Sequence, residues 1–400
     1  MAAIDEILSS SPSACYVFDA GVLKDRIRFL QASLPAQVTL CYAVKANPFI
    51  VGEAARVLDK FEICSPGEAA VCKAANLPSE QMVISGVYKT PEFIESLVSD
   101  PGFGGVFTVE SMSQYRLLCG LSARYGRTVP VLLRLTNGSQ FGINGAEIEE
   151  ILRCRSANPG IRCLGIQYFS GTQKFSLKKI RREIEELDQF LIHLRDDLGF
   201  CAEQLEYGPG FPYPYFDGEE FDEAAYLAEF SAMLGEMAFR TDITLELGRS
   251  IAASCGRYFT HIVDIKRNKG MNYAIVDGGM HHLVYFGQQM AMKRPKLSVI
   301  GKTGGDGETL WNICGSLCSM NDILVKQTPL PEIAPGDIIC FENTGAYCMT
   351  ECIALFLTRD IPAVWLVRED GSADCIRDTF ETSLLNTPNK ERMADHGQTY

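Results

Sequence analysis

The chain has 400 residues, of which 46% are hydrophobic and 22% are charged, a balance typical of globular proteins rather than disordered or fibrous ones. Its 37 basic and 50 acidic residues, with a formal net charge of −13, exclude a nucleic-acid binder that acts through a global positive field. The length predicts about two or three domains.

The sequence also bears on the compartment and on metal binding. No run of about 18 apolar residues predicts a membrane span, and residues 1–12 lack the pattern of a secretion signal. The 15 cysteines are scattered without a CxxC pair, and the pairs Cys314/Cys318 and Cys348/Cys352 have no neighbouring histidine to complete a zinc site. We therefore expect a cytoplasmic protein with reduced thiols and without a membrane span, a metal or a nucleic-acid partner.

From residue 21 to about residue 249, short β-rich runs alternate with amphipathic helical segments such as 91–98, 111–125, 176–198 and 222–237. The eight predicted strands are Val38–Val44, Phe61–Cys64, Met82–Ser85, Gly105–Thr108, Val129–Leu135, Arg162–Tyr168, Gln204–Tyr207 and Asp242–Leu247. Such alternation predicts parallel strands with helical crossovers, and eight repeats fit a (β/α)8 barrel. A doubly wound open sheet remains the alternative.

Beyond residue 249 the helical pattern stops, and strand-like runs separated by Gly, Pro, Asn and Asp predict an antiparallel β domain. The expected strands are Tyr258–Lys266, Tyr273–Val276, Leu283–Phe286, Asp337–Phe341 and Ala363–Arg368, together with Ala14–Asp19. We predict a barrel over residues 20–249, a β domain of residues 1–19 plus 250–385, and a frayed polar tail over 386–400.

Lys45 ends the first predicted barrel strand, where (β/α)8 barrels place their catalytic residues. A lysine that leaves an apolar strand is partly desolvated, which lowers its pKa and suits it to forming a Schiff base. A solvated lysine is the ordinary alternative, so this residue alone identifies no reaction.

Two further segments follow the seventh and eighth predicted strands. The turn 208–210 contains Gly208 and Gly210, and the segment 246–250 combines Glu246 with Gly248 and Arg249. Loops at these places form phosphate sites in many barrels, because glycines let backbone N–H groups approach the oxygens. Taken singly, the turn 208–210 is equally an ordinary tight turn, and Glu246 is equally an acid that caps a helix. Together with the strand-end lysine, they are the groups needed to hold pyridoxal 5′-phosphate (PLP).

The sequence resembles the fold-type III PLP-dependent decarboxylases, the family of the diaminopimelate, ornithine and arginine decarboxylases. The resemblance runs in the family's order from residue 15 to residue 367 and is carried by Tyr42–Asn47, Ser65–Glu68, Glu246–Ser250, Gly315–Asp322 and Gly345–Tyr347. It implies a (β/α)8 barrel followed by an antiparallel β-barrel domain like that of alanine racemase. It also implies a homodimer whose active sites are shared between two subunits.

The resemblance implies a role for each matching residue. Lys45 would hold PLP as a Schiff base, Glu246 would pair with the pyridine nitrogen, and Cys318 would protonate the carbanion left by decarboxylation. Asp322 would reach across the dimer interface towards the substrate. The other implied cofactor contacts are Phe169, Thr172, Gly208, Gly210, Gly248, Arg249 and Tyr347.

Two positions depart from the family pattern. Phe169 stands where the family has a histidine that stacks on the cofactor ring. Ser319 stands where the diamine-type enzymes have an acid that binds the distal ammonium of the substrate. A neutral hydroxyl cannot supply that charge-assisted contact, so diaminopimelate, ornithine and lysine are less favoured as substrates.

These departures, with the run from Asp277 to His282, resemble a subgroup from specialised biosynthesis. Its members act on conjugates or on amino acids carried by an acyl-carrier protein, as does the glutamyl-carrier-protein decarboxylase of butirosin assembly. His281 and His282 would line the path of the substrate, or are simply polar loop residues. The basic clusters 178–182 and 293–296 would dock an acidic carrier, or are solvated faces.

Three alternatives stay open. The diaminopimelate decarboxylase of lysine biosynthesis is the alternative for the substrate. A PLP racemase is less favoured because it lacks the block from Cys318 to Asp322, and a non-catalytic regulatory paralogue because Lys45, Glu246 and Arg249 are intact. We predict a homodimeric PLP-dependent amino-acid decarboxylase that acts on a carrier-tethered or conjugated substrate.

Overall fold

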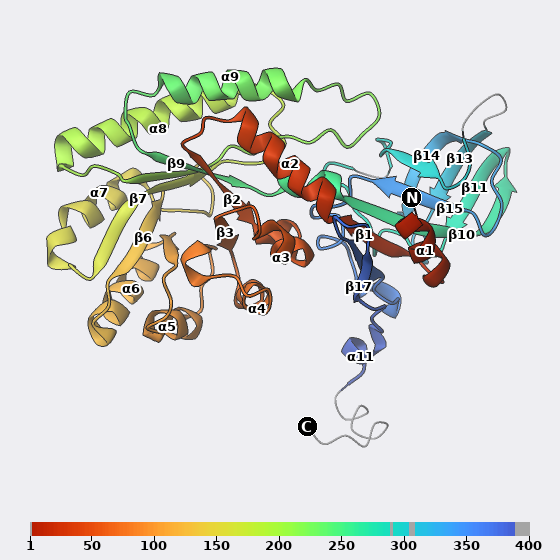
Figure 1. Cartoon of the computed structure of the whole chain (residues 1–400), viewed down its shortest axis with the longest axis horizontal. Helices are drawn as coiled ribbons and strands as arrows, with labels where there is room; N and C mark the ends of the chain where they lie inside the picture. The colour runs from red at the N-terminus through yellow and green to blue at the C-terminus, as the bar shows by residue number, and fades with distance from the viewer. Residues whose placement is uncertain (1, 289–290, 304–308, 389–400) are drawn as a thin grey trace. The chain divides into compact units, whose positions relative to one another are not determined.

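The computed structural model describes residues 2–288, 291–303 and 309–388. By their contacts the residues group into two compact units, a barrel unit of residues 24–213 and 221–251 and a sheet unit of residues 1–23, 214–220 and 252–400 (Figure 1). Among the described residues, no helix combines the length and the apolar character that crossing a membrane requires.

Eight parallel strands close into a barrel, as the alternation of strands and helices predicted. They are β2 (Val38–Ala43), β3 (Lys60–Ile63), β4 (Met82–Ile84), β5 (Val106–Val109), β6 (Val129–Arg134), β7 (Ile161–Phe169), β8 (Gln204–Gly208) and β9 (Asp242–Leu247). The pairing of β9 with β2, from Ile243 opposite Val38 to Leu247 opposite Tyr42, closes the ring. This closure excludes the doubly wound open sheet.

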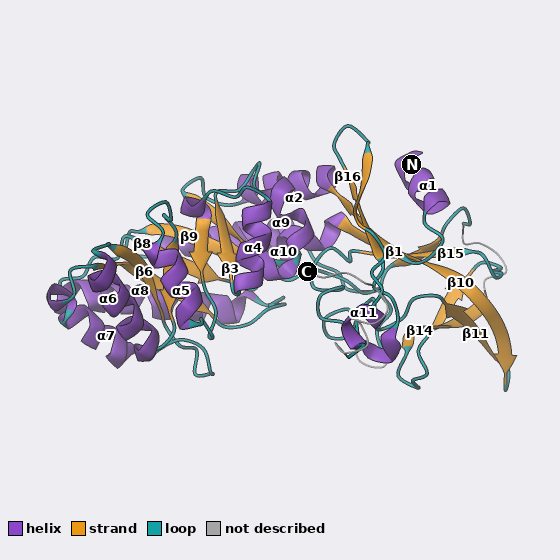
Figure 2. Ribbon diagram, turned by 90° about the horizontal axis from the view of Figure 1, so that it is seen from below, coloured by secondary structure: helices purple, strands orange, loops and turns teal. Residues whose placement is uncertain are grey.

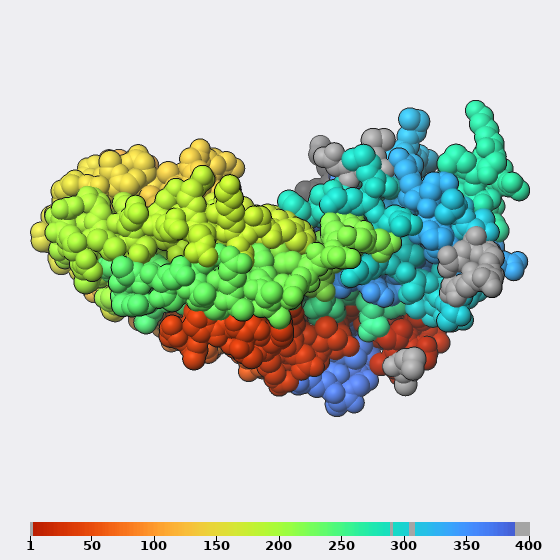
Figure 3. Space-filling model, turned by 90° about the horizontal axis from the view of Figure 1, so that it is seen from above, coloured from red at the N-terminus to blue at the C-terminus, as the bar shows by residue number. Residues whose placement is uncertain are grey.

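Helices lie against the outside of the barrel strands (Figure 2). They are α2 (Ala20–Ser33), α3 (Val51–Ala54), α4 (Pro66–Ala74), α5 (Pro91–Ser99), α6 (Met112–Tyr125), α7 (Gly145–Arg153), α8 (Leu177–Leu198), α9 (Glu223–Glu236) and α10 (Arg249–Ala252). The long helices α8 and α9 pack side by side along one face of this unit (Figures 1 and 3). Parallel strands need such crossovers because a tight turn cannot return the chain to the same end of the barrel.

Local sequence explains where several of these helices begin and end. α4 begins after Ser65, whose side chain accepts a hydrogen bond from Glu68 N. α7 begins with a capping box in which Asn144 and Glu147 each bond the backbone N–H of the other. α8 ends at Gly199, which takes the left-handed conformation with φ of 58°. Because these signals are local, the predicted helix boundaries nearly match those observed.

Among its described residues the sheet unit has nine strands. Their order is β14-β13-β11-β10-β1-β16-β17, with β15 paired to both β10 and β12. They are β1 (Cys15–Asp19), β10 (Gly256–Asn268), β11 (Met271–Val276), β12 (Leu297–Val299), β13 (Thr309–Cys314), β14 (Ile323–Leu330), β15 (Ile338–Glu342), β16 (Ala363–Val367) and β17 (Ala373–Arg377). Most pairs are antiparallel as predicted, but β1 pairs in parallel with β16, and β11 with β13. α1 (Ala2–Ser10) joins the core of this unit through Ile7, which packs with Cys15 and Phe259.

The predicted strand Leu283–Phe286 is wrong, because this segment forms turns and loop. Val284 N donates to Cys348 O and Gln288 N to Tyr285 O, so its backbone bonds do not form a ladder with one neighbouring strand. Tyr285 is buried and its hydroxyl donates to Glu342 O at 2.6 Å. The apolar residues that indicated a strand therefore serve the core of a loop.

Other parts of the sheet unit were not predicted from the sequence. These are the helix α1 and the strands β12, β13, β14 and β17. The predicted tail over 386–400 starts inside α11 (Ser383–Asn386), and its residues 389–400 lie outside the described part of the chain.

Candidate active site

Lys45 lies at the carboxyl end of β2, in the short helical turn Val44–Ala46. Its Nζ is 2.5 Å from Glu62 Oε2 on β3 and 3.5 Å from Glu246 Oε1 on β9. The Lys45 side chain is 40% exposed, whereas those of Glu62 and Glu246 are 2% and 5% exposed. An accessible lysine is thus held by two buried carboxyl groups.

The two carboxyl groups differ in how strongly they hold a proton. Burial alone raises the pKa of Glu62, but the Lys45 charge, hydrogen bonds with Glu246 and Lys45, and the Arg134 charge outweigh burial and lower it to about 2. Burial and the charge of Glu62 raise the pKa of Glu246 to about 7, against the opposing charge of Lys45. Glu62 is therefore ionised at neutral pH, whereas Glu246 is poised to hold or release a proton.

Lys89, which follows β4, is buried and has a different environment from Lys45. Its side chain is 4% exposed, and Nζ donates to Gly86 O at 2.7 Å, Gln114 Oε1 at 3.1 Å and Thr108 Oγ1 at 3.3 Å. Burial lowers its pKa to about 8. Its three acceptors hold this amine inside the structure, which leaves Lys45 as the better placed of the two to meet a ligand.

Like Glu62, two further polar residues inside the barrel were not singled out by the sequence analysis. Gln167 on β7 and Glu206 on β8 are fully buried and face each other in the register of these strands. Gln167 Nε2 donates to Glu246 Oε2 at 3.0 Å. A signal for such residues exists in the sequence, since Glu62 and Glu206 each stand alone between apolar neighbours within a predicted strand.

The loops after β7 and β8 touch backbone to backbone. Gly210 has a φ of 68°, and a Cβ placed on it would lie 2.0 Å from Gly171 O. A Cβ on Gly208 would lie 2.5 Å from the ring of Phe169. Lys174 N donates to Gly210 O at 3.1 Å and ties the two loops together. Only glycine fits at positions 208 and 210, because the loop after β7 packs directly against both; we call the segment 208–210 the glycine cradle.

The remaining predicted residues of the barrel unit lie at the same ends. Arg249 begins α10, is 5% exposed, and follows Gly248 directly after β9; Thr172 lies in the loop after β7. The predicted residues thus follow β7, β8, β9 and β2, which are neighbours in the barrel. A lysine amine, a buried carboxyl group, a glycine cradle and an arginine fit the aldehyde, pyridine nitrogen and phosphate of PLP.

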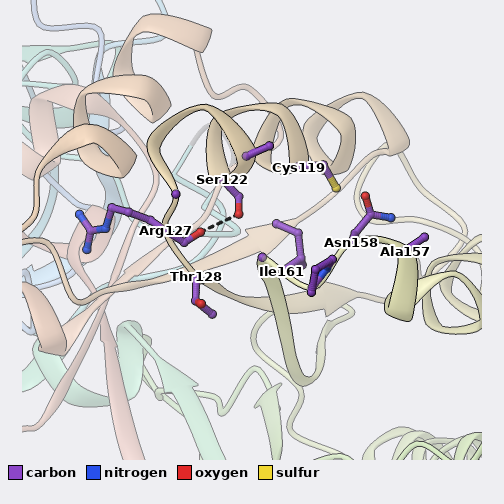
Figure 4. A pocket seen from close by; sticks show the side chains of 11 residues that line it. Cys119, Ser122, Arg127, Thr128, Ala157, Asn158 and Ile161 are labelled. Atoms are coloured by element: carbon purple, nitrogen blue, oxygen red, sulfur yellow. Dashed lines mark hydrogen bonds between the residues drawn. The ribbon is translucent and has the colours of Figure 1, made fainter.

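A pocket of about 360 Å³ lies at the opposite ends of the strands, beside the amino ends of β6 and β7 (Figure 4). Cys119, Ser122, Thr128 and Asn158 line it, and Ser122 Oγ donates to Arg127 O at 2.6 Å. None of the predicted site residues lines this pocket. Barrels of this class carry their chemistry at the carboxyl ends, so we place the candidate site around Lys45.

In the sheet unit, Cys318 lies exposed on the loop between β13 and β14. Asp322 closes this loop from within, since it is 2% exposed and accepts from Leu317 N at 2.8 Å and Met280 N at 2.7 Å. Ser319 Oγ accepts from Asn321 N at 3.2 Å in the same turn. The carboxylate of Asp322 is therefore turned inward, and the loop presents the Cys318 thiol at its surface.

The two histidines that the sequence analysis singled out, His281 and His282, are buried. His282 Nδ1 is 3.0 Å from Tyr258 Oη and its Nε2 is 2.7 Å from Asp360 O, so both ring nitrogens are engaged. Burial lowers the pKa of His282 to about 4 and that of His281 to about 3, so both rings are neutral at physiological pH. Tyr347 lies in the same unit, with a φ of 66° that is strained for a residue with a side chain.

Comparison with known proteins agrees with these observations. The family model described as pyridoxal-dependent decarboxylase, C-terminal sheet domain, matches residues 15–345. The chain is 24% identical over 392 residues to the L-glutamyl-[BtrI acyl-carrier protein] decarboxylase of Niallia circulans, covering 90% of each chain. It is 28% identical over 375 residues to the diaminopimelate decarboxylase of Actinosynnema pretiosum subsp. auranticum, covering 86% of this chain and 81% of that one.

Solved structures share the fold. The diaminopimelate decarboxylase of Helicobacter pylori complexed with L-lysine superposes with a TM-score of 0.84 at 21% identity, covering 99% of this chain and 100% of that one. A lysine/ornithine decarboxylase of Vibrio vulnificus complexed with putrescine gives a TM-score of 0.79 at 19% identity, covering 92% and 98%. Because the family model spans most of the barrel and much of the sheet unit, the chain belongs to the pyridoxal-dependent decarboxylase family.

Proposed function

We propose that this PLP-dependent decarboxylase acts on an amino acid whose distal end carries no positive charge and is joined to a carrier or a conjugate. The observation that carries the proposal is the surface of the loop 315–322. This loop presents Cys318 and the hydroxyl residue Ser319, while its one carboxylate, Asp322, is buried and bonded to backbone N–H groups. A loop without an exposed acid offers no charge-assisted contact to a distal ammonium.

In the proposed site, Lys45 holds the aldehyde end of PLP, Glu246 the pyridine nitrogen, and the 208–210 cradle with Arg249 the phosphate. Bound PLP supplies an electron sink for the electron pair that remains when a carboxylate leaves as carbon dioxide. Glu246 can provide a proton at the pyridine nitrogen, because its pKa of about 7 leaves it partly protonated at neutral pH. Ionised Glu62 forms an ion pair with the Lys45 amine at 2.5 Å and so holds it in position.

Other residues of the barrel unit support the ring and the phosphate in this proposal. Phe169 replaces a polar stacking residue by an apolar ring, which packs against Gly208. Thr172 adds a hydroxyl next to the cradle, since a Cβ on Gly210 would lie 3.1 Å from Thr172 Cα. Gly248 of the barrel unit and Tyr347, which belongs to the sheet unit, are the remaining residues that the resemblance implies as cofactor contacts.

Cys318 is the proposed acid. Its exposed thiol gives one proton to the α-carbon of the substrate, where the proton takes the place of the departed carboxylate. The proposal includes a homodimer in which this loop serves a shared site. Asp322 is then a brace for the loop and His282 a structural residue, because the polar atoms of both are bonded inside the sheet unit.

The proposal of a tethered substrate does not rest on the two basic clusters. Arg181 pairs with Glu236 at 3.0 Å, and Lys293 pairs with Glu219 at 3.1 Å. These pairs partly neutralise the clusters 178–182 and 293–296. Support comes instead from the loop 315–322 and from the similarity to a relative whose name describes a carrier-protein substrate.

The test measures carbon dioxide release by the PLP-loaded protein. The substrates are free diaminopimelate, lysine, ornithine, arginine and glutamate, and glutamate loaded on an acyl-carrier protein. We expect turnover of the tethered glutamate and not of the free diamino acids. Fast turnover of free diaminopimelate would instead identify the lysine-pathway enzyme, the alternative kept open by the 28% identical relative.

Two variants sharpen this test. Ser319→Asp restores an acid at the departing position, and we expect it to raise turnover of free lysine or ornithine relative to the unchanged protein. Lys45→Ala should lose the mass increment that borohydride fixes between PLP and this lysine. Retention of that increment in Lys45→Ala would place the cofactor on another lysine, whatever the substrate is.

A further inference from the structure

Glu206 is a buried acid that the proposed chemistry leaves unused. It lies on β8 with no exposed surface, and neither of its carboxyl oxygens has a donor in hydrogen-bonding geometry among the described residues. The same is true of Oε1 of its neighbour Gln167. A buried polar atom without a hydrogen-bond partner loses its hydration with nothing in return, so this group of oxygens needs an explanation.

The strand register places these atoms in one small region. Gln167 on β7 is directly opposite Glu206 on β8, and residues opposite each other on parallel strands point to the same side. That side is the barrel interior, because Gln167 Nε2 reaches Glu246 Oε2 on β9. Glu206 therefore lies inside the barrel, beside the amide that holds Glu246.

A count of donors and acceptors shows what is missing. Gln167 donates one N–H of its amide nitrogen to Glu246, and its Oε1 can only accept. The second N–H of this nitrogen is not in hydrogen-bonding geometry with either Glu206 oxygen, and an ionised Glu206 could offer no hydrogen to Gln167 Oε1. A single proton on Glu206 turns one of its oxygens into a donor for Gln167 Oε1.

The charges around Glu206 favour this proton. Burial raises the pKa of Glu206 well above its ordinary value, and the nearby Glu246 on β9 and Glu62 on β3 raise it further. Lys60, also on β3, and the Gln167 amide oppose the shift without cancelling it. The thiol of Cys41 on β2 faces the same group, and burial raises its pKa too, so it adds no charge.

We propose that Glu206 is a protonated carboxylic acid which donates a hydrogen bond to Gln167 Oε1 and so orients the amide that holds Glu246. The bond fixes Gln167 with Nε2 towards Glu246 Oε2, whereas the reversed amide would set oxygen against oxygen. Glu246 Oε1, the oxygen on the side of Lys45, then stays available to the group that Glu246 binds in the proposed site. Glu206 and Gln167 are positioning residues in the site, and this inference rests on the proposed role of Glu246.

Infrared spectroscopy of the cofactor-free protein tests the protonation directly. Glu246 is present in both proteins, so at neutral pH the difference spectrum between the unchanged protein and Glu206→Gln should show the carbonyl stretch of a protonated carboxylic acid. Glu183→Gln is the matched control, since this buried carboxylate accepts from Lys174 Nζ at 2.8 Å and Tyr207 Oη at 2.6 Å and is ionised. A carboxylate band in the Glu206 difference would overturn the proposal.

A pair of variants tests the positioning. Glu206→Gln keeps a neutral donor of nearly the same shape. We expect the affinity for PLP to stay within about 2-fold of that of the unchanged protein. We expect the pH midpoint of the visible absorbance of bound PLP to stay the same. Glu206→Leu removes the donor, and we expect PLP affinity to fall about 10-fold, as for other groups that orient a ligand through a neighbour. Equal behaviour of the two variants would refute the positioning role.

The outcomes separate this inference from the proposed function. The infrared measurement needs no cofactor, so it reports on Glu206 even if Lys45 does not hold PLP. Should Glu206→Leu fail to fold, the absorbance of Glu206→Gln and the infrared difference decide the matter. A large shift of the midpoint in Glu206→Gln would then count against the proposal.

Discussion

Replacing Gly210 by alanine tests the glycine cradle. The backbone at Gly210 has a φ of 68°, a conformation that costs an L-residue about 1 kcal/mol. The new Cβ would lie 2.0 Å from Gly171 O, and real Cβ contacts essentially never fall below 3.0 Å. The loops after β7 and β8 must therefore move apart by about 1 Å, a displacement that can lower a catalytic rate about 100-fold.

Gly199 provides the matched control in the same unit. Its φ is 58°, and the nearest atom to its Cβ would be Arg155 Nη2 at 3.9 Å, an ordinary contact. Gly199→Ala should lose the same conformational term, about 1 kcal/mol of unfolding free energy, without moving the cradle. Comparing the two variants isolates the effect of the close approach at Gly210.

Two assays measure the effects of the two variants on stability and on PLP binding. Urea unfolding should give a loss of about 1 kcal/mol for Gly199→Ala and at least that for Gly210→Ala. Equilibrium titration with PLP, followed by absorbance, should show wild-type affinity for Gly199→Ala and at least about 10-fold weaker binding for Gly210→Ala. Gly210→Ala with unchanged PLP affinity and rate would refute the phosphate role of the cradle.

Three further predictions concern single side chains. Folding raises the pKa of Glu246 from about 4.5 to about 7, so its proton stabilises the cofactor-free fold at low pH, and this stabilisation is lost as the pH rises through that window. Between pH 4.5 and pH 7, the unfolding free energy of Glu246→Gln in urea should therefore rise relative to that of the unchanged protein by at most about 3 kcal/mol. Parallel pH dependences of the two proteins would contradict this. Cys318→Ala should keep PLP on its lysine but lower steady-state carbon dioxide release about 100-fold, because the missing proton transfer delays the next turnover; a wild-type steady-state rate would remove Cys318 as the acid. Asp322→Asn should lower the unfolding free energy by about 1–3 kcal/mol and speed the alkylation of Cys318, because a backbone N–H loses its acceptor. Asp370→Asn, in an exposed turn, is the control and should change neither the unfolding free energy nor the alkylation rate.

The strands of the barrel were predictable because their signals are local. Each run of apolar and β-branched residues is bounded by a turn or a helix cap, as at Ser65 before α4. The same kind of signal failed at Leu283–Phe286, where apolar residues pack a buried loop. In the sheet unit, β1 pairs with β16 more than 340 residues later, and no local pattern specifies such a partner.

The candidate site also has parts that the sequence predicted and parts that it did not. The motifs around Lys45, Gly210 and Glu246 were legible in the sequence, because each couples a chemical group to the end of a strand. The predicted contact of Asp322 with the substrate stays a prediction, but its carboxylate also accepts from Leu317 N and Met280 N, which the motif did not indicate. The direction of a side chain depends on backbone groups from other segments, which a motif does not contain.

By itself the sequence determined the barrel, its order of strands and helices, and the residues that we propose for holding PLP. Only the tertiary structure decided which groups meet. The barrel brings Glu62, Gln167, Glu206 and Glu246 from four strands into one interior, and it sets Lys45 between two of these acids. Charge state and hydrogen bonding there depend on burial and on neighbours distant in sequence, so proton positions in the site are properties of the fold.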